Sequence, residues 1–124
     1  MTIDEFSSLV EEALEGIPAE FLDHLENVEV EVEEWPSRAD LQAAGVDPGG
    51  RGNLLGLYHG VPNTKRGAFY VALPDRITIF KGPIELYAGP DRTGIRDQVR
   101  RTVIHEIAHY YGISDERLTE LGWG

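Results

Sequence analysis

The stretch that decides the fold is "TVIHEIAHYYGISDERL", Thr102 to Leu118. His105 and His109 are four residues apart, so on an α-helix they lie one turn apart on the same face. Glu106 lies on the flank of that face. Two imidazoles in this arrangement can bind one metal ion, and the carboxylate beside them can act on a water molecule without binding the metal. The alternative is an ordinary amphipathic helix with two unconnected histidines.

A long helix is expected around these residues, from about Thr93 to Tyr111. Val99, Val103 and Ile107 form an apolar ladder on one side of it, which should pack on a β-sheet. Gly112 ends the helix, because glycine readily adopts the left-handed conformation that reverses the chain. The turn should bring the following residues back beneath the two histidines.

A third metal ligand is therefore expected just after the turn. The full string is His-Glu-x-x-His-x-x-Gly-x-x-Asp, and Asp115 stands where metzincin-type peptidases place a third histidine. A carboxylate binds zinc well, so Asp115 is the predicted ligand. Glu116 and Glu120 are the alternatives. An acidic residue in the first turn of a helix is also favoured by the helix dipole alone.

These residue types suit the hydrolysis of peptide bonds. Neutral imidazole is a good ligand for Zn²⁺, which lowers the pKa of a bound water molecule to around 7. Glu106 is the candidate general base, which takes a proton from the zinc-activated water and passes it to the leaving amine. A set of two histidines and one carboxylate can also bind iron or manganese, so the pattern leaves the identity of the metal open.

The composition limits the other classes of site. The chain has 124 residues, which predicts one domain over residues 1–124, and its 41% hydrophobic and 27% charged residues are ordinary for a soluble globular protein. It contains no cysteine. Disulfide scaffolds, thiolate zinc fingers and cysteine nucleophiles are therefore excluded, and any metal must be held by His, Asp or Glu.

The charge is unevenly distributed. The net charge is −11, and residues 1–34 hold twelve acidic residues and no Lys or Arg. This acidic segment argues against nucleic acid or an anionic membrane as a partner. A solvated face is the preferred interpretation, and attraction of a basic partner is the alternative. No apolar run is long enough to span a bilayer, and the acidic N-terminus does not resemble a signal peptide, so a cytoplasmic protein is expected.

The remaining elements follow from periodicity and from turn residues. Helices are expected over residues 3–14, 18–25, 37–43 and 114–121. Strands are expected over residues 28–34, 54–59, 68–73 and 76–80. Residues 45–53 should form a glycine-rich connection, and residues 82–94 a loop with at most one helical turn. The fold class is thus α+β, with one small mixed β-sheet packed against helices.

The chain resembles the minimal zincins, a family of small bacterial zinc metallopeptidases. The resemblance is densest in "LLGLYHGVP", "LPDRITIFKGPIE" and "VRRTVIHEIAHYYGISDERLTELGW", and it covers nearly the whole chain. It implies a zincin-like fold with the His-Glu-x-x-His motif on a long C-terminal helix, a Zn²⁺ cofactor and a peptide or protein substrate. By motif position, it implies His105, His109 and Asp115 as zinc ligands and Glu106 as the general base.

The resemblance also implies that an edge strand, near residues 68–73 or 76–80, binds an extended peptide by strand addition. Two features depart from larger metzincins: Met1 is the sole methionine, so there is no methionine turn, and the chain lacks a second subdomain. These departures favour one alternative, a non-catalytic zinc-binding structural or interaction module. A further alternative is a domain that binds no metal, in which the motif is an ordinary stretch of helix.

Overall fold

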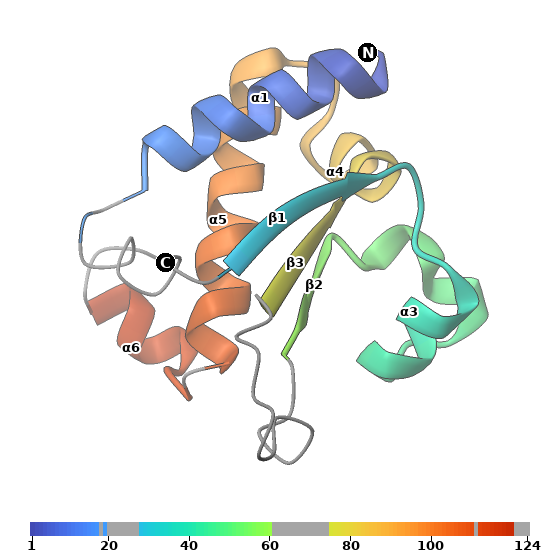
Figure 1. Cartoon of the computed structure of the whole chain (residues 1–124), viewed down its shortest axis with the longest axis vertical. Coiled ribbons are helices and arrows are strands. Elements are labelled where there is room, and N and C mark those ends of the chain that lie inside the picture. Colours follow the sequence, from blue (N-terminus) through green and yellow to red (C-terminus); the bar gives the residue numbers. More distant parts are fainter. Residues whose placement is uncertain (18, 20–27, 61–74, 111, 121–124) are drawn as a thin grey trace, which may run out of the picture.

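A three-stranded β-sheet lies at the centre of the fold (Figure 1). The computed structural model describes residues 1–17, 19, 28–60, 75–110 and 112–120. The strands are β1 (Val28–Glu33), β2 (Gly56–His59) and β3 (Asp75–Phe80), in the order β1-β3-β2. β1 is parallel to β3 and β2 is antiparallel to it. The predicted α+β class with a small mixed sheet is confirmed.

The alternating sequence of β1 determines which face of the sheet is buried. Val30 pairs with Ile77 and Val32 with Ile79, and both isoleucines are fully buried in the core. The valines of β1 pack against the same cluster. Because successive side chains of a strand point to opposite faces, the glutamates of β1 lie on the other side of the sheet. The predicted valine face is therefore the core face.

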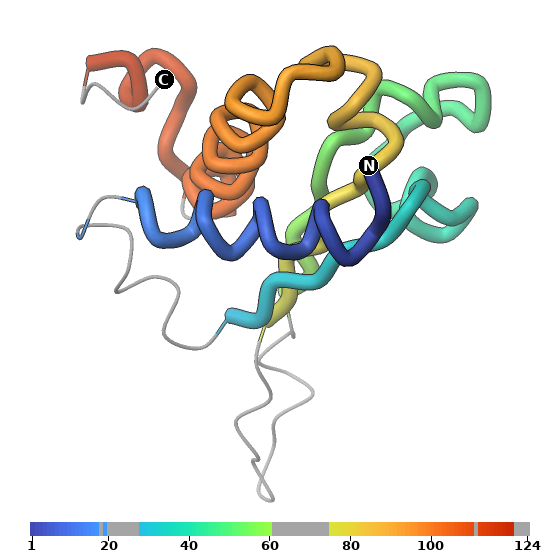
Figure 2. The backbone as a smooth tube through the Cα atoms, turned by 90° about the horizontal axis from the view of Figure 1, so that it is seen from above, coloured from blue at the N-terminus to red at the C-terminus, as the bar shows by residue number. Residues whose placement is uncertain are grey.

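Two helices supply the other half of the core. α5 (Arg92–Tyr110) packs on β2 and β3, and α1 (Ile3–Glu15) packs mainly on α5. Seen from above, α1 runs across the molecule between α5 and β1 (Figure 2). α1 begins after Thr2, whose side chain accepts a hydrogen bond from the Glu5 backbone, and it is capped by Gly16. The fully buried residues of the two helices include Phe6, Leu9, Val99, Val103 and Ile107.

Two segments are more helical than expected. Residues 81–88 form the helix α4 (Lys81–Ala88), where the sequence predicted a loop with at most one turn. Pro83 lies in the first turn, where a proline needs no backbone hydrogen-bond partner, and Ile84 is fully buried and holds the helix to the core. The expected glycine-rich connection contains the 3₁₀ segment η2 (Pro48–Asn53), which begins at its proline.

The two other short helices match their predictions. α3 (Arg38–Ala44) begins with a capping box, in which Ser37 and Asp40 each accept a hydrogen bond from the other's backbone N–H. α6 (Asp115–Glu120) carries the buried Leu118. Among the described residues, no helix has the length and hydrophobicity needed to cross a membrane.

One prediction about the sheet is wrong. β3, which contains residues 76–80, is the central strand and pairs on both sides, so it cannot be the edge strand that binds a peptide. Strand pairing is set by long-range contacts that alternation within one strand does not reveal. The predicted helix over residues 18–25 and the predicted strand over residues 68–73 lie outside the described residues.

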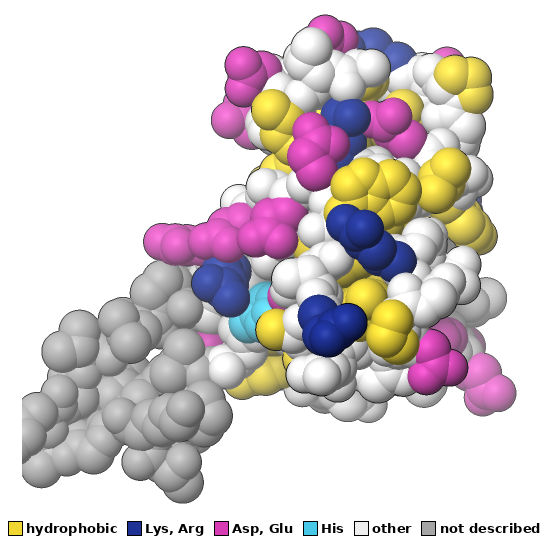
Figure 3. All heavy atoms as spheres, turned by 90° about the vertical axis from the view of Figure 1, so that its right-hand side faces the viewer, with side chains coloured by type: hydrophobic (Ala, Val, Ile, Leu, Met, Phe, Trp, Pro, Cys, Tyr) yellow, Lys and Arg dark blue, Asp and Glu magenta, His cyan; other side chains and the backbone are white. Residues whose placement is uncertain are grey.

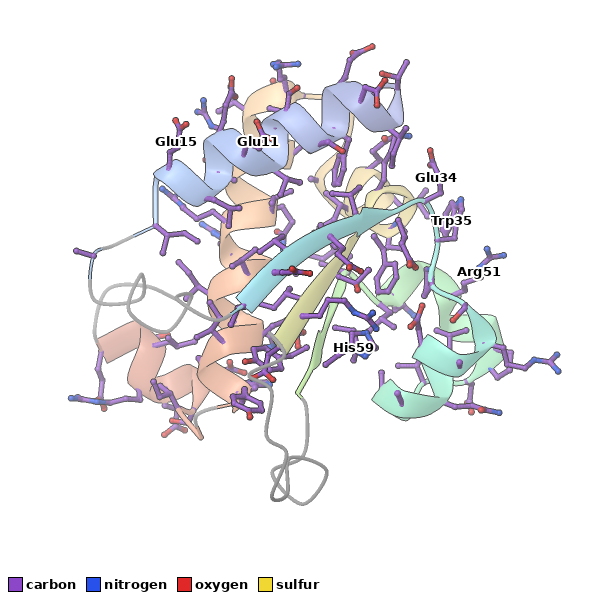
Figure 4. All side chains as sticks on the ribbon, viewed as in Figure 1. Glu11, Glu15, Glu34, Trp35, Arg51 and His59 are labelled. Carbon is purple, nitrogen blue, oxygen red and sulfur yellow. The ribbon has the colours of Figure 1, made fainter. Side chains whose placement is uncertain are left out.

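The acidic N-terminal segment faces solvent where it is described. Glu11 and Glu15 of α1 are exposed and point away from the sheet (Figure 4). The face on the α3 side of the molecule carries acidic and basic side chains together, with hydrophobic ones between them (Figure 3). On that side the Arg51 guanidinium lies 5.4 Å from the centroid of the Trp35 ring. The charge is thus mixed on this face, whereas α1 presents only acidic charged side chains.

The contact between α1 and α5 is expected to contribute much of the stability. Phe6→Ala removes a fully buried ring from the core face of α1 and should lower the free energy of unfolding by about 3–5 kcal/mol. Denaturant unfolding followed by circular dichroism measures the change. Glu11→Ala, on the exposed side of α1, is the control and should change stability little. A loss below about 1 kcal/mol for Phe6→Ala would contradict this packing.

Candidate metal centre

The orientation of α5 follows from its apolar ladder. Val99, Val103 and Ile107 are all fully buried, as predicted, and they hold one side of the helix against the core. His105 and His109 therefore lie on a side that remains accessible, with about half of each side chain exposed. Their ring centroids are 3.9 Å apart. The same packing that buries the ladder presents the two imidazoles together.

The turn at Gly112 brings the chain back towards the histidines. Gly112 has φ of 75°, a left-handed conformation that glycine adopts without strain. Its N–H donates to the carbonyl of His109, and the Ile113 N–H donates to that of Ala108. The chain then enters α6, where Leu118 is 3% exposed and holds the helix in the core. The short helix thereby places Asp115 beside α5.

Three potential metal-binding side chains meet at this turn. Asp115 Oδ1 is 3.2 Å from His105 Nδ1 and 3.3 Å from His109 Nε2. One ligand atom from each of the three lies within 4.8 Å of the others. In a tetrahedral zinc site with bonds near 2.0–2.1 Å, neighbouring ligand atoms are about 3.3 Å apart. The donor types suit zinc, and both distances from Asp115 Oδ1 to the histidine nitrogens match this spacing.

The two alternative carboxylates lie outside this cluster. Among the described residues, the group that can hold a metal ion consists of His105, His109 and Asp115. Glu120 instead forms an ion pair with Arg117, whose Nη1 lies 2.9 Å from Glu120 Oε2. Glu116 follows Asp115 directly and is exposed. Of the three candidates for third ligand, the geometry brings only Asp115 to the histidines.

Glu106 lies beside the cluster and is more buried than the histidines. Its carboxylate accepts a hydrogen bond from the backbone N–H of Tyr58 in β2. Burial raises the pKa of the Glu106 carboxyl above its usual value, and the neighbouring His109 and the Tyr58 N–H oppose this rise. A carboxylate whose pKa is raised towards neutrality is a stronger base when ionised, which suits proton transfer.

The environment of His105 favours its neutral form. Burial lowers the pKa of the His105 imidazole, and the neighbouring His109 lowers it further. The carboxylate of Asp115 acts in the opposite direction. Because a histidine binds metal through its neutral ring, a lowered pKa reduces the competition between protons and a metal ion.

The edge of β2 that faces away from β3 runs next to this cluster. The Phe80 N–H donates to the Leu55 carbonyl, just before β2 begins. Hydrogen-bonded and non-hydrogen-bonded pairs alternate along an antiparallel ladder, so the backbone groups of Gly56 and Tyr58 point away from β3. The bond from Tyr58 to Glu106 agrees with this register. β2, and not β3, is the described edge strand beside the histidines.

Gly56 allows β2 to lie close to α5. A Cβ atom at this position would be 2.7 Å from Thr102 Cγ2 and 3.2 Å from the Thr78 carbonyl oxygen. Gly56→Ala is therefore expected to push β2 away from α5 and to lower the free energy of unfolding by about 1–3 kcal/mol. Thermal unfolding measures the loss. Gly49→Ala is the matched control, because no atom lies within 4 Å of a Cβ there. Equal losses in the two variants would refute the close approach.

A cavity opens on one side of the cluster. It has a volume of about 400 Å³ and extends from His105 and Glu106 along α5 towards α4 and the start of β2. The residues that line it are Asn53, Leu54, Leu55, Gly56, Tyr87, Gln98, Arg101, Thr102, His105 and Glu106. Apolar and polar side chains thus share the wall of a hollow that reaches the candidate base.

The sequence pattern did not indicate every residue at this site. Tyr58 hydrogen-bonds Glu106, stacks on Tyr110 with ring centroids 4.1 Å apart, and donates its hydroxyl proton to Asp75 Oδ2 at 2.7 Å. Strand alternation places Tyr58 and His59 on opposite faces. His59 accordingly points towards α3, where its Nε2 is 3.9 Å from Asp40 Oδ1 (Figure 4).

Comparisons with known proteins show the family to which the chain is similar. The sequence model of the zincin-like metallopeptidases matches residues 25–123. The chain is also similar to the solved structure of a conserved hypothetical protein from Thermus thermophilus, with 28% identity and a TM-score of 0.55. That similarity covers 96% of this chain and 98% of the other. No curated protein matches the chain.

Proposed function

Because the chain belongs to the zincin-like metallopeptidase family, we propose that it is a zinc-dependent hydrolase of peptide bonds. In this proposal His105, His109 and Asp115 hold the zinc ion, and Glu106 is the general base. The observation that carries the proposal is the meeting of these three donors beside a largely buried carboxylate. When bound, zinc supplies a Lewis acid that polarises a peptide carbonyl and lowers the pKa of a water molecule.

Glu106 moves the proton in the proposed reaction. Its carboxylate accepts a proton from the attacking water molecule and then donates it to the nitrogen of the leaving amine. The hydrogen bond from the Tyr58 N–H fixes the direction of the carboxylate. Burial of Glu106 keeps its carboxyl away from bulk water, which strengthens its interactions with a bound substrate. Its contact with β2 also ties the base to the edge where a peptide would bind.

Among the described residues β2 pairs with β3 alone, and its other edge supports a binding mode for the substrate. The Tyr58 N–H already donates to Glu106, but the backbone groups of Gly56 also point away from β3, and an extended peptide can pair with such groups by strand addition. A peptide paired there would lie beside Glu106 and close to the histidine face of α5. Strand addition relies on main-chain hydrogen bonds, so it accepts many sequences, and selectivity must come from the cavity beside it.

The proposal is tested in two steps. Elemental mass spectrometry on protein purified without a histidine tag should find about one zinc per chain. If the protein instead contains about one iron or manganese ion per chain, the three residues still form a metal site, but its chemistry is different from that of zinc. Absence of bound metal, even after reconstitution with zinc, would refute the proposal. A peptide library incubated with the zinc-loaded protein, and analysed by mass spectrometry, should then yield internal cleavage products.

A further inference from the structure

The cavity beside the candidate base has one positively charged residue in its wall. Arg101 lies four residues before His105, so the two side chains share a face of α5 and are one turn apart. Of the described residues that line the cavity, Arg101 is the only lysine or arginine, and Glu106 is the only acidic residue. The cavity therefore has a cationic end and a catalytic end.

Arg101 has no carboxylate partner among the described residues. It is exposed, whereas Lys81, Arg76 and Arg117 each lie within ion-pair distance of a glutamate. Arg96 and Arg100 of the same helix likewise have no ion pair among the described residues, so Arg101 is distinguished by its place in the cavity wall. A guanidinium presents paired N–H donors that match the two oxygens of a carboxylate. The group that would complement this end of the cavity is thus a carboxylate.

Two other polar side chains of the wall, those of Gln98 and Thr102, are hydrogen-bonded. The Gln98 side-chain amide donates to Thr102 Oγ1 at 3.2 Å, and the Thr102 hydroxyl donates to the Gln98 carbonyl at 2.8 Å. Thr102 is 5% exposed and lies at the base of the cavity. The side chains of Leu55 and Tyr87 add apolar surface. Among these groups, Arg101 is the one with both charge and unused donors.

We propose that Arg101 selects peptides that carry a carboxylate next to the bond that is cleaved. This inference rests on the proposed function, and it names the class of substrate. The carboxylate is either the side chain of an aspartate or glutamate or the terminal carboxylate of the peptide, since both present the same group to the guanidinium. The cavity reaches both Arg101 and Glu106, so the selected residue adjoins the reacting bond.

The test measures binding separately from cleavage. The zinc-loaded Glu106→Gln protein is titrated with fluorescent ten-residue peptides, in which one position is Asp, Asn, Lys or Leu and the C-terminus is free or amidated. Peptides with a carboxylate should bind about tenfold more tightly than their Asn or amide counterparts. If amidation removes the advantage, the terminal carboxylate is the ligand; if Asp retains it in amidated peptides, the side chain is.

Variants of Arg101 assign the preference to this residue. Adding Arg101→Gln to the Glu106→Gln protein should abolish the advantage, and adding Arg101→Glu should turn it into a preference for Lys. Arg96→Gln is the matched control, because Arg96 is exposed on the same helix and does not line the cavity. It should leave the preference unchanged. An equal preference in the Arg101→Gln protein, a preference for Leu, or no binding of carboxylate peptides would each overturn the inference.

The outcomes separate this inference from the proposed function. Cleavage by the wild-type protein without a carboxylate preference would refute the role of Arg101 and leave the hydrolase intact. A carboxylate preference in binding, without cleavage by the wild-type protein, would refute the hydrolase and leave the role of Arg101. Mapping of the cleavage products should place the selected residue directly beside the broken bond.

Discussion

The Glu106→Gln protein is expected to retain its zinc and to hydrolyse peptides about 10²–10⁴-fold more slowly than the wild type. Glutamine has nearly the same shape as glutamate, and its side-chain oxygen can still accept the hydrogen bond from the Tyr58 N–H. It cannot take up the proton. The comparison of initial rates on one peptide, at equal zinc occupancy measured by elemental mass spectrometry, isolates this proton transfer.

The control for this experiment is Glu116→Gln. Glu116 is exposed, lies outside the cluster and has the same charge, so its removal should leave the rate unchanged. If Glu106→Gln also leaves the rate unchanged, Glu106 is not the base. If neither the wild type nor the variants cleave any peptide while both bind zinc, the non-catalytic zinc-binding module becomes the better interpretation of the site.

Asp115→Ala should weaken zinc binding by about 100-fold or more, since loss of groups that only support a metal ligand already costs about 10–100-fold. Asp115 Oδ1 lies within 3.3 Å of a nitrogen atom of both histidines, so its removal takes away the contact that joins α6 to α5 at the site. Competition with a fluorescent zinc chelator at constant pH measures the affinity.

Glu116→Ala and Glu120→Ala are the matched controls, because each removes one carboxylate from α6. Both variants should bind zinc within about threefold of the wild type. The carboxylates of Glu116 and Glu120 act on the zinc ion only through their charge at the surface, which salt screens. Equal affinities in all three variants would remove Asp115 from the metal site. A larger loss for Glu120→Ala than for Asp115→Ala would assign the third ligand to Glu120.

The sequence predicted well which side chains meet where the contacts are local. The spacing of His105 and His109, the apolar ladder and the glycine at position 112 all lie within one stretch of chain. Helix geometry converts such spacing into a shared face, and a single left-handed residue fixes the direction of the return. These inferences need no knowledge of distant parts of the chain, which is why the donors meet as expected.

Features that depend on distant neighbours were not predicted. The order of strands puts β3 in the centre, although its sequence is equally consistent with an edge. α4 forms because Ile84 packs in the core. Gly82 and Pro83, directly before it, favour a loop when the sequence is considered alone. The hydrogen bond from Tyr58 to Glu106 and the place of Arg101 in the cavity wall depend on how β2 packs against α5. Tertiary contacts determine each of these features, whereas the periodicity of the sequence indicates only which face of an element is apolar.

The turn at Gly112 has a consequence for how the site assembles. His105, His109 and Asp115 fall within a single short stretch of chain, so the loop that must close to bring them together is small. The entropy lost on closing a loop grows with its length, and contacts close in sequence form early in folding. The three donor side chains can therefore come together before the strands pair. The strands pair more slowly, and they complete the wall of the cavity beside donors that are already close together.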